Sequence, residues 1–182
     1  MEYPWYEVLT NSQELQQGDF IQQCPIVIPP TYLPKNGEII DIDIQCINSI
    51  ILSQSCDLSG DGKIINVLVC PYKGLKNFLE GLPPDRVQNS KAKERTISNL
   101  KQGQFPAYHI LNKSSEFSFL SDYQVVDFRN VYAVNFDALK SFASKCSERA
   151  RLLPPYREHL SQAFARFLMR VGLPQDFKID GY

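Results

Sequence analysis

INSIILSQSCDLSGDGKIINVLVCPY, residues 47–72, decides the fold expected for this chain. Two runs rich in β-branched residues, 46–52 and 64–70, flank a short polar segment, and the turn Ser-Gly-Asp-Gly at 59–62 precedes the second run. Such runs on either side of a glycine-rich turn are typical of paired antiparallel strands. The stretch therefore predicts two paired strands with small polar side chains displayed where the first strand ends.

Two further strands are predicted upstream of this pair. Residues 20–28 form an apolar run, and the Cys-Pro pair at 24–25 predicts a bulge or edge position because proline cannot donate to a strand ladder. Residues 38–44 alternate acidic and apolar side chains, which predicts a half-buried strand with Asp41 and Asp43 on its solvated face. No third ligand accompanies these two carboxylates, so we predict no metal site there.

The chain after residue 104 predicts a mixture of strands and helices. We expect a hairpin of 105–111 and 116–120, strands over 123–128 and 131–134, a helix over 138–151 and a C-terminal helix over about 155–171. The last helix has the clearest pattern, because its apolar residues form one stripe and Gly172 follows it. We expect the stripe to pack on the core, although it could also form a homodimer interface.

Residues 73–104 differ from their surroundings, since seven basic residues stand against three acidic ones. The pattern predicts two short helices, one ended by Gly81 and one that begins at Asn89 or Ser90 and is closed by Gly103. A basic helical insertion between strands is the best candidate in the chain for contact with phosphates. A solvated helix face is the commoner explanation of such a pattern.

Length and composition favour a soluble α+β protein with a single domain. The chain has 182 residues, of which 43% are hydrophobic and 21% charged, and it holds no apolar run of the roughly 20 residues that a membrane span needs. Its N-terminus lacks the basic region of a signal peptide, so we expect a cytoplasmic protein without membrane contact. The single domain spans 1–182, with a β core over 16–72 and 105–136, the insertion 73–104 and C-terminal helices over 137–174.

Charge is distributed unevenly along the chain although the net charge is only −1. Residues 1–62 hold nine carboxylates and one basic residue, Lys35, whereas the remaining chain holds 18 basic and 11 acidic residues. A basic face for nucleic acid and charge complementarity between the two halves both explain this asymmetry. The second explanation is favoured, since the protein as a whole is not basic.

The cysteine pattern predicts buried thiols and no cofactor. The five cysteines are Cys24, Cys46, Cys56, Cys70 and Cys146. They form no Cys-x-x-Cys pair and no Cys/His cluster with zinc-ligand spacing. The glycine-rich segment 59–63 lacks the spacing of a phosphate-binding loop, so we interpret it as a turn.

The polar segment after the first strand supports one catalytic hypothesis. Cys56 and Asp57 could form a Cys-His-Asp arrangement with His109, if folding brings the histidine to them. A simpler interpretation is that Ser53, Ser55 and Asp57 cap the turn through hydrogen bonds from side chain to backbone.

Four segments together resemble the PemK/MazF-like toxins: Gly-Asp-Phe-Ile at 18–21, Ile-Ile-Leu-Ser at 50–53, Val-Leu-Val-Cys-Pro at 67–71 and Gln-Val-Val-Asp-Phe-Arg at 124–129. The resemblance implies a small, strongly bent antiparallel β-barrel and, in the active members, metal-independent RNA cleavage. A separate likeness, over 53–58, 156–160 and 170–174, is to a group of uncharacterised bacterial proteins and implies no activity.

The chain departs from the toxin pattern at both catalytic positions. The active members use an Arg just before the second apolar strand, where this chain has Ile47 or Asn48, and a Ser or Thr just after the Cys-Pro strand, where it has Tyr-Lys-Gly at 72–74. Lys73 or Arg129 could replace the missing cation. The departure favours a barrel that binds without cleaving by the family mechanism.

The sequence therefore predicts a binding module of bacterial toxin–antitoxin or defence type that engages RNA or a protein partner. The residues expected to bind are Ser53, Gln54, Ser55, Lys73 and Arg129, together with the insertion. Two enzyme hypotheses stand beside it: an endoribonuclease with relocated catalytic groups, and a cysteine-dependent hydrolase that uses Cys56 and His109. A structural subunit that recruits a partner through the C-terminal helix is a further alternative.

Overall fold

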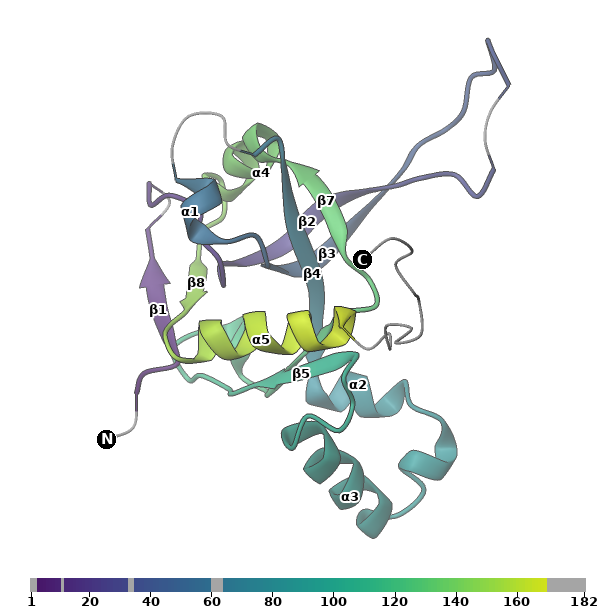
Figure 1. Ribbon diagram of the computed structural model, residues 1–182, viewed down its shortest axis with the longest axis vertical. Helices are drawn as coiled ribbons and strands as arrows, with labels where there is room; N and C mark the ends of the chain where they lie inside the picture. Colours follow the sequence, from purple (N-terminus) through teal and green to yellow (C-terminus); the bar gives the residue numbers. More distant parts are fainter. Residues whose placement is uncertain (1–2, 11, 33–34, 60–63, 170–182) are drawn as a thin grey trace, which may run out of the picture.

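The computed structural model describes residues 3–10, 12–32, 35–59 and 64–169, which form a mixed α+β protein with antiparallel sheets (Figure 1). In chain order the elements are β1 (Tyr6–Leu9), β2 (Phe20–Ile28), β3 (Asp43–Ile51), α1 (Ser55–Leu58), β4 (Asn66–Gly74), α2 (Leu75–Glu80), the 3₁₀ helix η1 (Pro84–Arg86), α3 (Ser90–Lys101), β5 (Tyr108–Leu111), the 3₁₀ helix η2 (Ser118–Leu120), β6 (Gln124–Asp127), β7 (Tyr132–Asn135), α4 (Phe136–Ala143), β8 (Arg149–Leu152) and α5 (Tyr156–Leu168). The predicted class is thereby confirmed. Among the described helices, none is long and apolar enough to cross a membrane.

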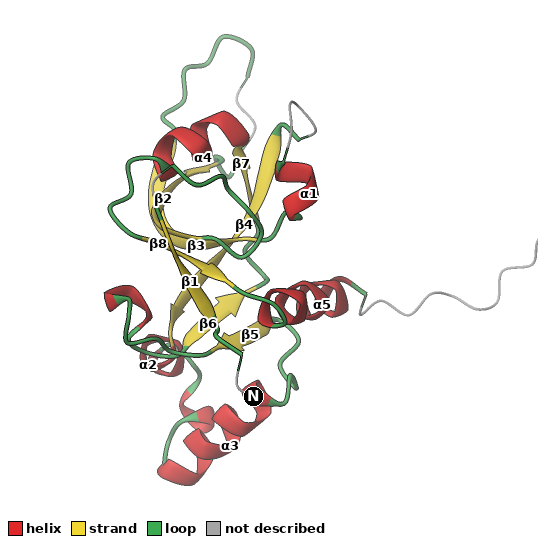
Figure 2. Ribbon diagram, turned by 90° about the vertical axis from the view of Figure 1, so that its left-hand side faces the viewer, coloured by secondary structure: helices red, strands yellow, loops and turns green. Residues whose placement is uncertain are grey.

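Strand β4 is the centre of the larger sheet, because it pairs with β3, β6 and β7. The strand order is β2-β3-β4-β6-β5, with β7 also on β4, while β1 and β8 form a separate two-stranded sheet. Figure 2 shows the strands strongly curved around the core. The pairing of the described strands does not close on itself, so the predicted closed barrel is not confirmed.

The predicted strands β2, β3 and β4 are confirmed, and so is an irregularity in β2. β3 pairs antiparallel with β4, with Ile50 opposite Cys70. The register of β2 against β3 shifts between Ile21 and Cys24, where Gln23 has a φ of 50°. The bulge predicted at the Cys-Pro pair thus begins just before it, and it bends β2.

The predicted hairpin of 105–111 and 116–120 is wrong, since β5 pairs with β6 instead. Residues 118–120 form η2, and the Ser114 N–H donates to the Leu120 carbonyl at 2.8 Å. Phe117 and Leu120 are both buried in the core. Burial of two large apolar side chains in a compact turn stabilises it over an extended strand.

The predicted helix over 138–151 is also wrong in its second half. α4 ends at Ala143, and residues 149–152 form β8, which pairs with β1. Its side chains alternate across the strand, so that Arg149 and Arg151 share one face and both reach the buried carboxylate of Asp19. The predicted C-terminal helical pair is therefore two helices separated by a strand.

The half-buried strand predicted over 38–44 is likewise wrong. β3 begins at Asp43, and together with β2 and their connection it forms an arm that projects from the body (Figure 1). We call this segment the β2–β3 arm; its described residues are 27–32 and 35–44, and their side chains are largely exposed. Ile39 is 96% exposed and Ile42 60%. The period-2 pattern is real, but in the described chain no second layer covers its apolar face.

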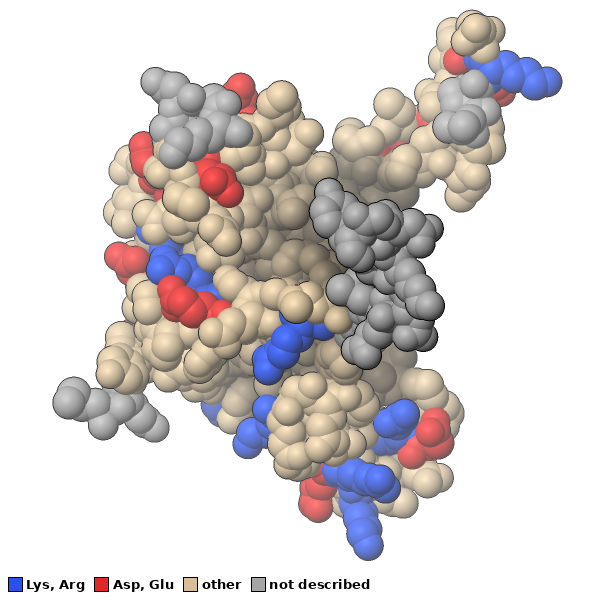
Figure 3. Space-filling view, viewed as in Figure 1, with Lys and Arg blue, Asp and Glu red and all other residues tan. Residues whose placement is uncertain are grey.

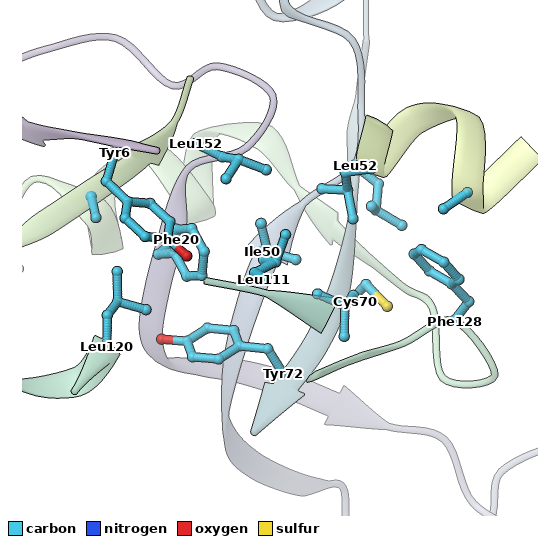
Figure 4. Packing of buried hydrophobic residues seen from close by; sticks show 14 of the residues in the cluster. Tyr6, Phe20, Ile50, Leu52, Cys70, Tyr72, Leu111, Leu120, Phe128 and Leu152 are labelled. Carbon is cyan, nitrogen blue, oxygen red and sulfur yellow. The ribbon is translucent and has the colours of Figure 1, made fainter. Parts of the chain in front are cut away.

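The core consists of three clusters, the third of which joins Leu75 and Phe78 of α2 to Leu100 of α3 and Val125 of β6. Figure 4 shows the first, in which Tyr6, Phe20 and Tyr72 come together from β1, β2 and β4. Leu160 and Ala163 of α5 are buried in the same cluster, so the apolar stripe predicted as core is confirmed there. The second cluster lies under α4 and includes Leu139.

The prediction that all the cysteine thiols are buried is wrong for part of the set. Cys24 and Cys70 are buried, Cys146 is partly buried, and Cys46 and Cys56 are exposed. The five cysteines, all of them in the described chain, form no disulfide.

A buried ion cluster joins the N-terminal segment to β8. Asp19, Arg149 and Arg151 are 0%, 1% and 6% exposed. Arg151 Nη2 donates to Asp19 Oδ2 at 3.0 Å, and Arg149 Nη1 lies 3.9 Å from the same oxygen. Arg149 also donates to the carbonyl of Gln13 at 2.6 Å, and Arg151 to that of Glu14 at 2.7 Å. The predicted complementarity between the acidic and basic halves is therefore present at this one buried site.

We predict that Asp19→Asn strongly destabilises the fold, because it leaves two buried guanidinium groups without their counter-charge. The expected loss is about 3–5 kcal/mol in the free energy of unfolding. Urea denaturation followed by the fluorescence of the single tryptophan, Trp5, measures it. Asp41→Asn in the exposed arm is the matched control and should change stability by less than about 0.5 kcal/mol. Equal stability of the two variants would contradict the role given to Asp19.

Candidate functional site

The polar segment at 53–57 is held by hydrogen bonds to the backbone. Ser53 Oγ accepts from the Leu68 N–H at 2.8 Å, and Ser55 Oγ accepts from the Gln17 N–H at 3.2 Å. Both serines thus bond to backbone groups, as the simpler interpretation expected, but to distant segments and not within the turn, and α1 has no side-chain cap. Gln54 Oε1 lies 3.6 Å from Cys56 Sγ, so that this residue too faces its neighbours.

The structure keeps Cys56 and Asp57 together but places His109 elsewhere. Cys56 Sγ lies 3.6 Å from Asp57 Oδ1 on the exposed helix α1. His109 lies on β5, where its ring is 6.4 Å from that of Phe128. α1 and β5 are well separated in both views (Figures 1 and 2). The three groups of the predicted Cys-His-Asp arrangement are therefore not assembled in this structure.

Lys73 and Arg129, in contrast, are brought to one place by the pairing of β4, β6 and β5. Asp127 stands opposite Tyr108 in register. Arg129 holds the Asp127 carboxylate in a bidentate pair, with Nε at 2.9 Å and Nη2 at 2.7 Å from its oxygens. The Arg129 guanidinium also lies 4.8 Å from the centre of the Tyr108 ring. The carboxylate and the ring together fix the direction of this cation.

Phe78 extends this arrangement toward Lys73. Its ring packs edge to face on Tyr108 at 4.8 Å, and Lys73 Nζ lies 5.8 Å from its centre. The five residues Lys73, Phe78, Tyr108, Asp127 and Arg129 form what we call the Lys73–Arg129 cluster. It presents two cations and an aromatic ring within one small area, the combination that phosphates and stacked bases use.

The electrostatics keep this cluster charged. Burial alone raises the pKa of Asp127, but hydrogen bonds from Arg129 and the charges of Arg129 and Lys73 bring that pKa below its ordinary value. The hydrogen bond to Asp127 in turn raises the pKa of Arg129. The Arg129 side chain is 55% exposed, so one face of the guanidinium is open to a ligand.

The basic insertion lies at the same end of the molecule. α2 follows β4 directly, and both predicted helices are confirmed, with the Asn89 side chain accepting from the Ala92 N–H at the start of α3. Figure 3 shows Lys and Arg side chains gathered over the end formed by α2 and α3. Within the described residues, Arg86 is the one cation of this insertion that forms an ion pair, with Asp85 at 3.7 Å. The positive charge there is thus available to an external anion.

A second cationic group was missed by our sequence reasoning. His109, His159, Arg166 and Lys101 line one cavity of about 330 Å³, which we call the histidine pocket. Burial, followed by the charges of His159 and Arg166, lowers the pKa of His109 to about 4. His159 and Arg166 are seven residues apart on α5, two turns of one helix face, and this spacing was the available signal.

Metals and known relatives offer no further guide to the site. Among the described residues, no group of three or more His, Cys, Asp or Glu side chains could hold a metal ion. A scan against protein-family models and a search of the curated proteins each find no match for this chain. The function is therefore argued from the geometry of the two cationic groups.

We predict that His109 makes the fold less stable in acid. The pKa of about 4 in the folded state lies below the ordinary 6.5, so the unfolded chain binds a proton first as the pH falls from about 6.5 toward 4. Stability present above pH 6.5 is therefore lost across that window, by about 2–3 kcal/mol. Lys101, His159 and Arg166 line the same pocket as His109, and the charges of His159 and Arg166 act in the same direction as burial.

The measurement is the free energy of unfolding in urea at pH 7.0, 5.5 and 4.5. His109→Gln should flatten the decline relative to the wild type, whereas His159→Gln should retain most of it. An unchanged pH dependence in His109→Gln would contradict the assignment.

Proposed function

We propose that this chain is an RNA-binding module, of the bacterial toxin–antitoxin or defence type expected from its sequence, that grips the phosphate backbone without cleaving it. The observation that carries the proposal is the Lys73–Arg129 cluster, in which two cations lie beside the partly exposed ring of Tyr108, with Phe78 buried beneath. Its residues come from distant parts of the sequence. Single-stranded RNA is recognised by such pairs of cation and aromatic ring.

The charge of the insertion supports the same proposal. Lys76, Lys91, Lys93 and Arg95 are all exposed and lie on α2 and α3, which follow the cluster directly. A strand of RNA needs a continuous track of positive charge, because its phosphates repeat along the chain. The cluster and the two helices place several exposed cations at one end of the molecule.

The PemK/MazF-like architecture belongs to this proposal. β2, β3 and β4 are antiparallel neighbours in the order that the toxin motifs imply. Lys73 is the second residue after the Cys-Pro pair of β4, within the Tyr-Lys-Gly segment where the toxins place a catalytic hydroxyl. A cation there binds a phosphate but does not attack it, which is consistent with binding without cleavage.

We predict salt-sensitive retention of single-stranded RNA. In the double variant Lys73→Gln/Arg129→Gln, the affinity for a mixed-sequence 20-mer should fall roughly tenfold at low salt, and the slope of affinity against salt should become shallower. Fluorescence anisotropy between 50 and 300 mM salt measures both quantities. Arg129→Lys should bind RNA more tightly than Arg129→Gln, because lysine keeps the positive charge although it cannot form the bidentate pair.

The matched control is Lys140→Gln/Lys145→Gln on and just after α4, which removes the same charge far from α3 (Figure 1). Its affinity should equal that of the wild type, and thermal melting should show that both double variants fold. An equal loss of RNA affinity in the two double variants would mean that binding depends on the net charge of the protein and not on the Lys73–Arg129 cluster. Cleavage of the RNA that is lost in Cys56→Ala would favour the enzyme hypothesis instead.

A second candidate function, protein binding, is favoured by the β2–β3 arm. Val27, Tyr32 and Ile44 of the arm are 58%, 56% and 59% exposed, in addition to Ile39 and Ile42. β2 is also an edge strand, which pairs only with β3 among the described strands. Exposed apolar residues on an edge strand commonly mark an interface. The expected homodimer fits this arm better than the C-terminal helix, whose stripe is largely used by the core.

We predict concentration-dependent dimerisation through the arm. Light scattering after size exclusion should give a dimer for the wild type at high protein concentration and a monomer for Ile39→Ser/Ile42→Ser. The matched control is Leu168→Ser/Met169→Ser at the end of α5, where both side chains are also exposed. A monomer at all concentrations would reject the homodimer.

A further inference from the structure

The histidine pocket gathers side chains from four parts of the chain. Lys101 ends α3, His109 lies on β5, and His159 and Arg166 lie on α5. Trp5 closes one side, where its ring stacks on Tyr156 with 3.5 Å between ring centres. The two histidines are the only ones in the chain. Sequence distance therefore hides this pocket, and the fold assembles it.

The pocket has an excess of positive charge. None of the described residues that line it is acidic. Burial, and after it the charges of His159 and Arg166, lower the pKa of His109, so the positive charge of the pocket does not come from His109 and includes Lys101 and Arg166. Cations that repel one another in a partly enclosed cavity are stabilised by a bound anion, and a phosphate dianion provides two negative charges and several acceptor oxygens.

An apolar cavity adjoins the histidine pocket. It has a volume of about 450 Å³, and Trp5, Lys101 and Ile110 line both cavities. Beyond these shared residues, Ile97 and Tyr123 give it an apolar wall with one aromatic ring. Two joined cavities, one cationic and one apolar and aromatic, match the two ends of a nucleotide.

We propose that the two cavities together bind a nucleoside monophosphate, with the phosphate at Lys101, His159 and Arg166 and the base in the apolar cavity. The shared chemistry is a phosphate monoester on a nucleoside. A free nucleotide and the 5′ end of an RNA strand both supply it. The inference goes beyond the proposed function, because a free nucleotide binds here whether or not RNA binds the Lys73–Arg129 cluster.

Isothermal titration of the full chain with adenosine 5′-monophosphate tests the proposal. We expect saturable binding that weakens at least tenfold in His159→Gln and in Arg166→Gln and is unchanged in Lys140→Gln, which removes one charge on α4. Adenosine and inorganic phosphate, titrated separately, should each bind more weakly than the nucleotide. Inorganic phosphate that binds as tightly as the nucleotide would overturn the assignment of the base to the apolar cavity.

NMR of the histidine side chains gives a second readout that is independent of calorimetry. A bound phosphate should raise the pKa of His109, since a nearby negative charge offsets the repulsion from His159 and Arg166. The chain has two histidines, so its imidazole spectrum can be assigned from one variant. An unchanged His109 titration in the presence of the nucleotide would overturn the placement of the phosphate.

Two oligoribonucleotides distinguish the two sources of the phosphate. A 10-mer with a 5′-phosphate that binds better than the same 10-mer with a 5′-hydroxyl, with the difference lost in Arg166→Gln, identifies an RNA end as ligand. Binding of the mononucleotide without such a difference identifies a free nucleotide. Absence of both effects overturns the inference. In that case the proposed function still holds if the protein binds RNA and this binding depends on Lys73 and Arg129.

Discussion

The buried carboxylate of Asp19 between Arg149 and Arg151 is the interaction on which the rest of the structure depends. A lone buried charge is costly, and removal of one member of a buried ion pair destabilises a protein far more than loss of a surface pair. Both arginines also donate to backbone carbonyls of the segment before β2, at Thr10, Gln13 and Glu14. The cluster thus fixes the N-terminal segment, the start of β2 and β8 against one another.

The position of β8 carries this constraint to the histidine pocket. The Leu152 N–H donates to the Gly18 carbonyl at 2.9 Å, and the Leu153 N–H donates to the Trp5 carbonyl at the same distance. Tyr156 begins α5 three residues later and stacks on Trp5. The orientation of α5, and with it the place of His159 and Arg166, therefore follows from where β8 lies. The histidine pocket is coupled in this way to an ion cluster that does not line it.

Charge is separated in space as well as in sequence. One of the nine carboxylates in residues 1–62, Asp19, pairs with two arginines inside the protein, while Glu38, Asp41 and Asp43 project on the β2–β3 arm away from the basic α2–α3 end (Figures 1 and 3). Complementarity between the halves and a basic face are thus both present. They occupy different sites, which reconciles two explanations that seemed to exclude each other.

Local chemistry explains most of what was predicted correctly. The Asn89 cap, the glycine after α2 and the apolar runs of β2, β3 and β4 act over a few residues, so the sequence contains the whole signal. The stripe of α5 was readable for the same reason. The failures at 116–120 and 138–151 were of another kind, because the conformation there depends on burial of Phe117 and Leu120 and on the pairing of Arg149 and Arg151 with Asp19.

By itself the sequence determined the α+β class, the antiparallel pairing of the two strands around residues 47–72 and the two helices of the insertion. Only the tertiary structure decided that His109 lies away from Cys56 and beside His159, and that the β2–β3 arm is exposed. The physical reason is range. Strand and helix signals act between neighbours in the chain, whereas a site built from β5, α5 and the N-terminus exists only once β8 has brought distant segments together.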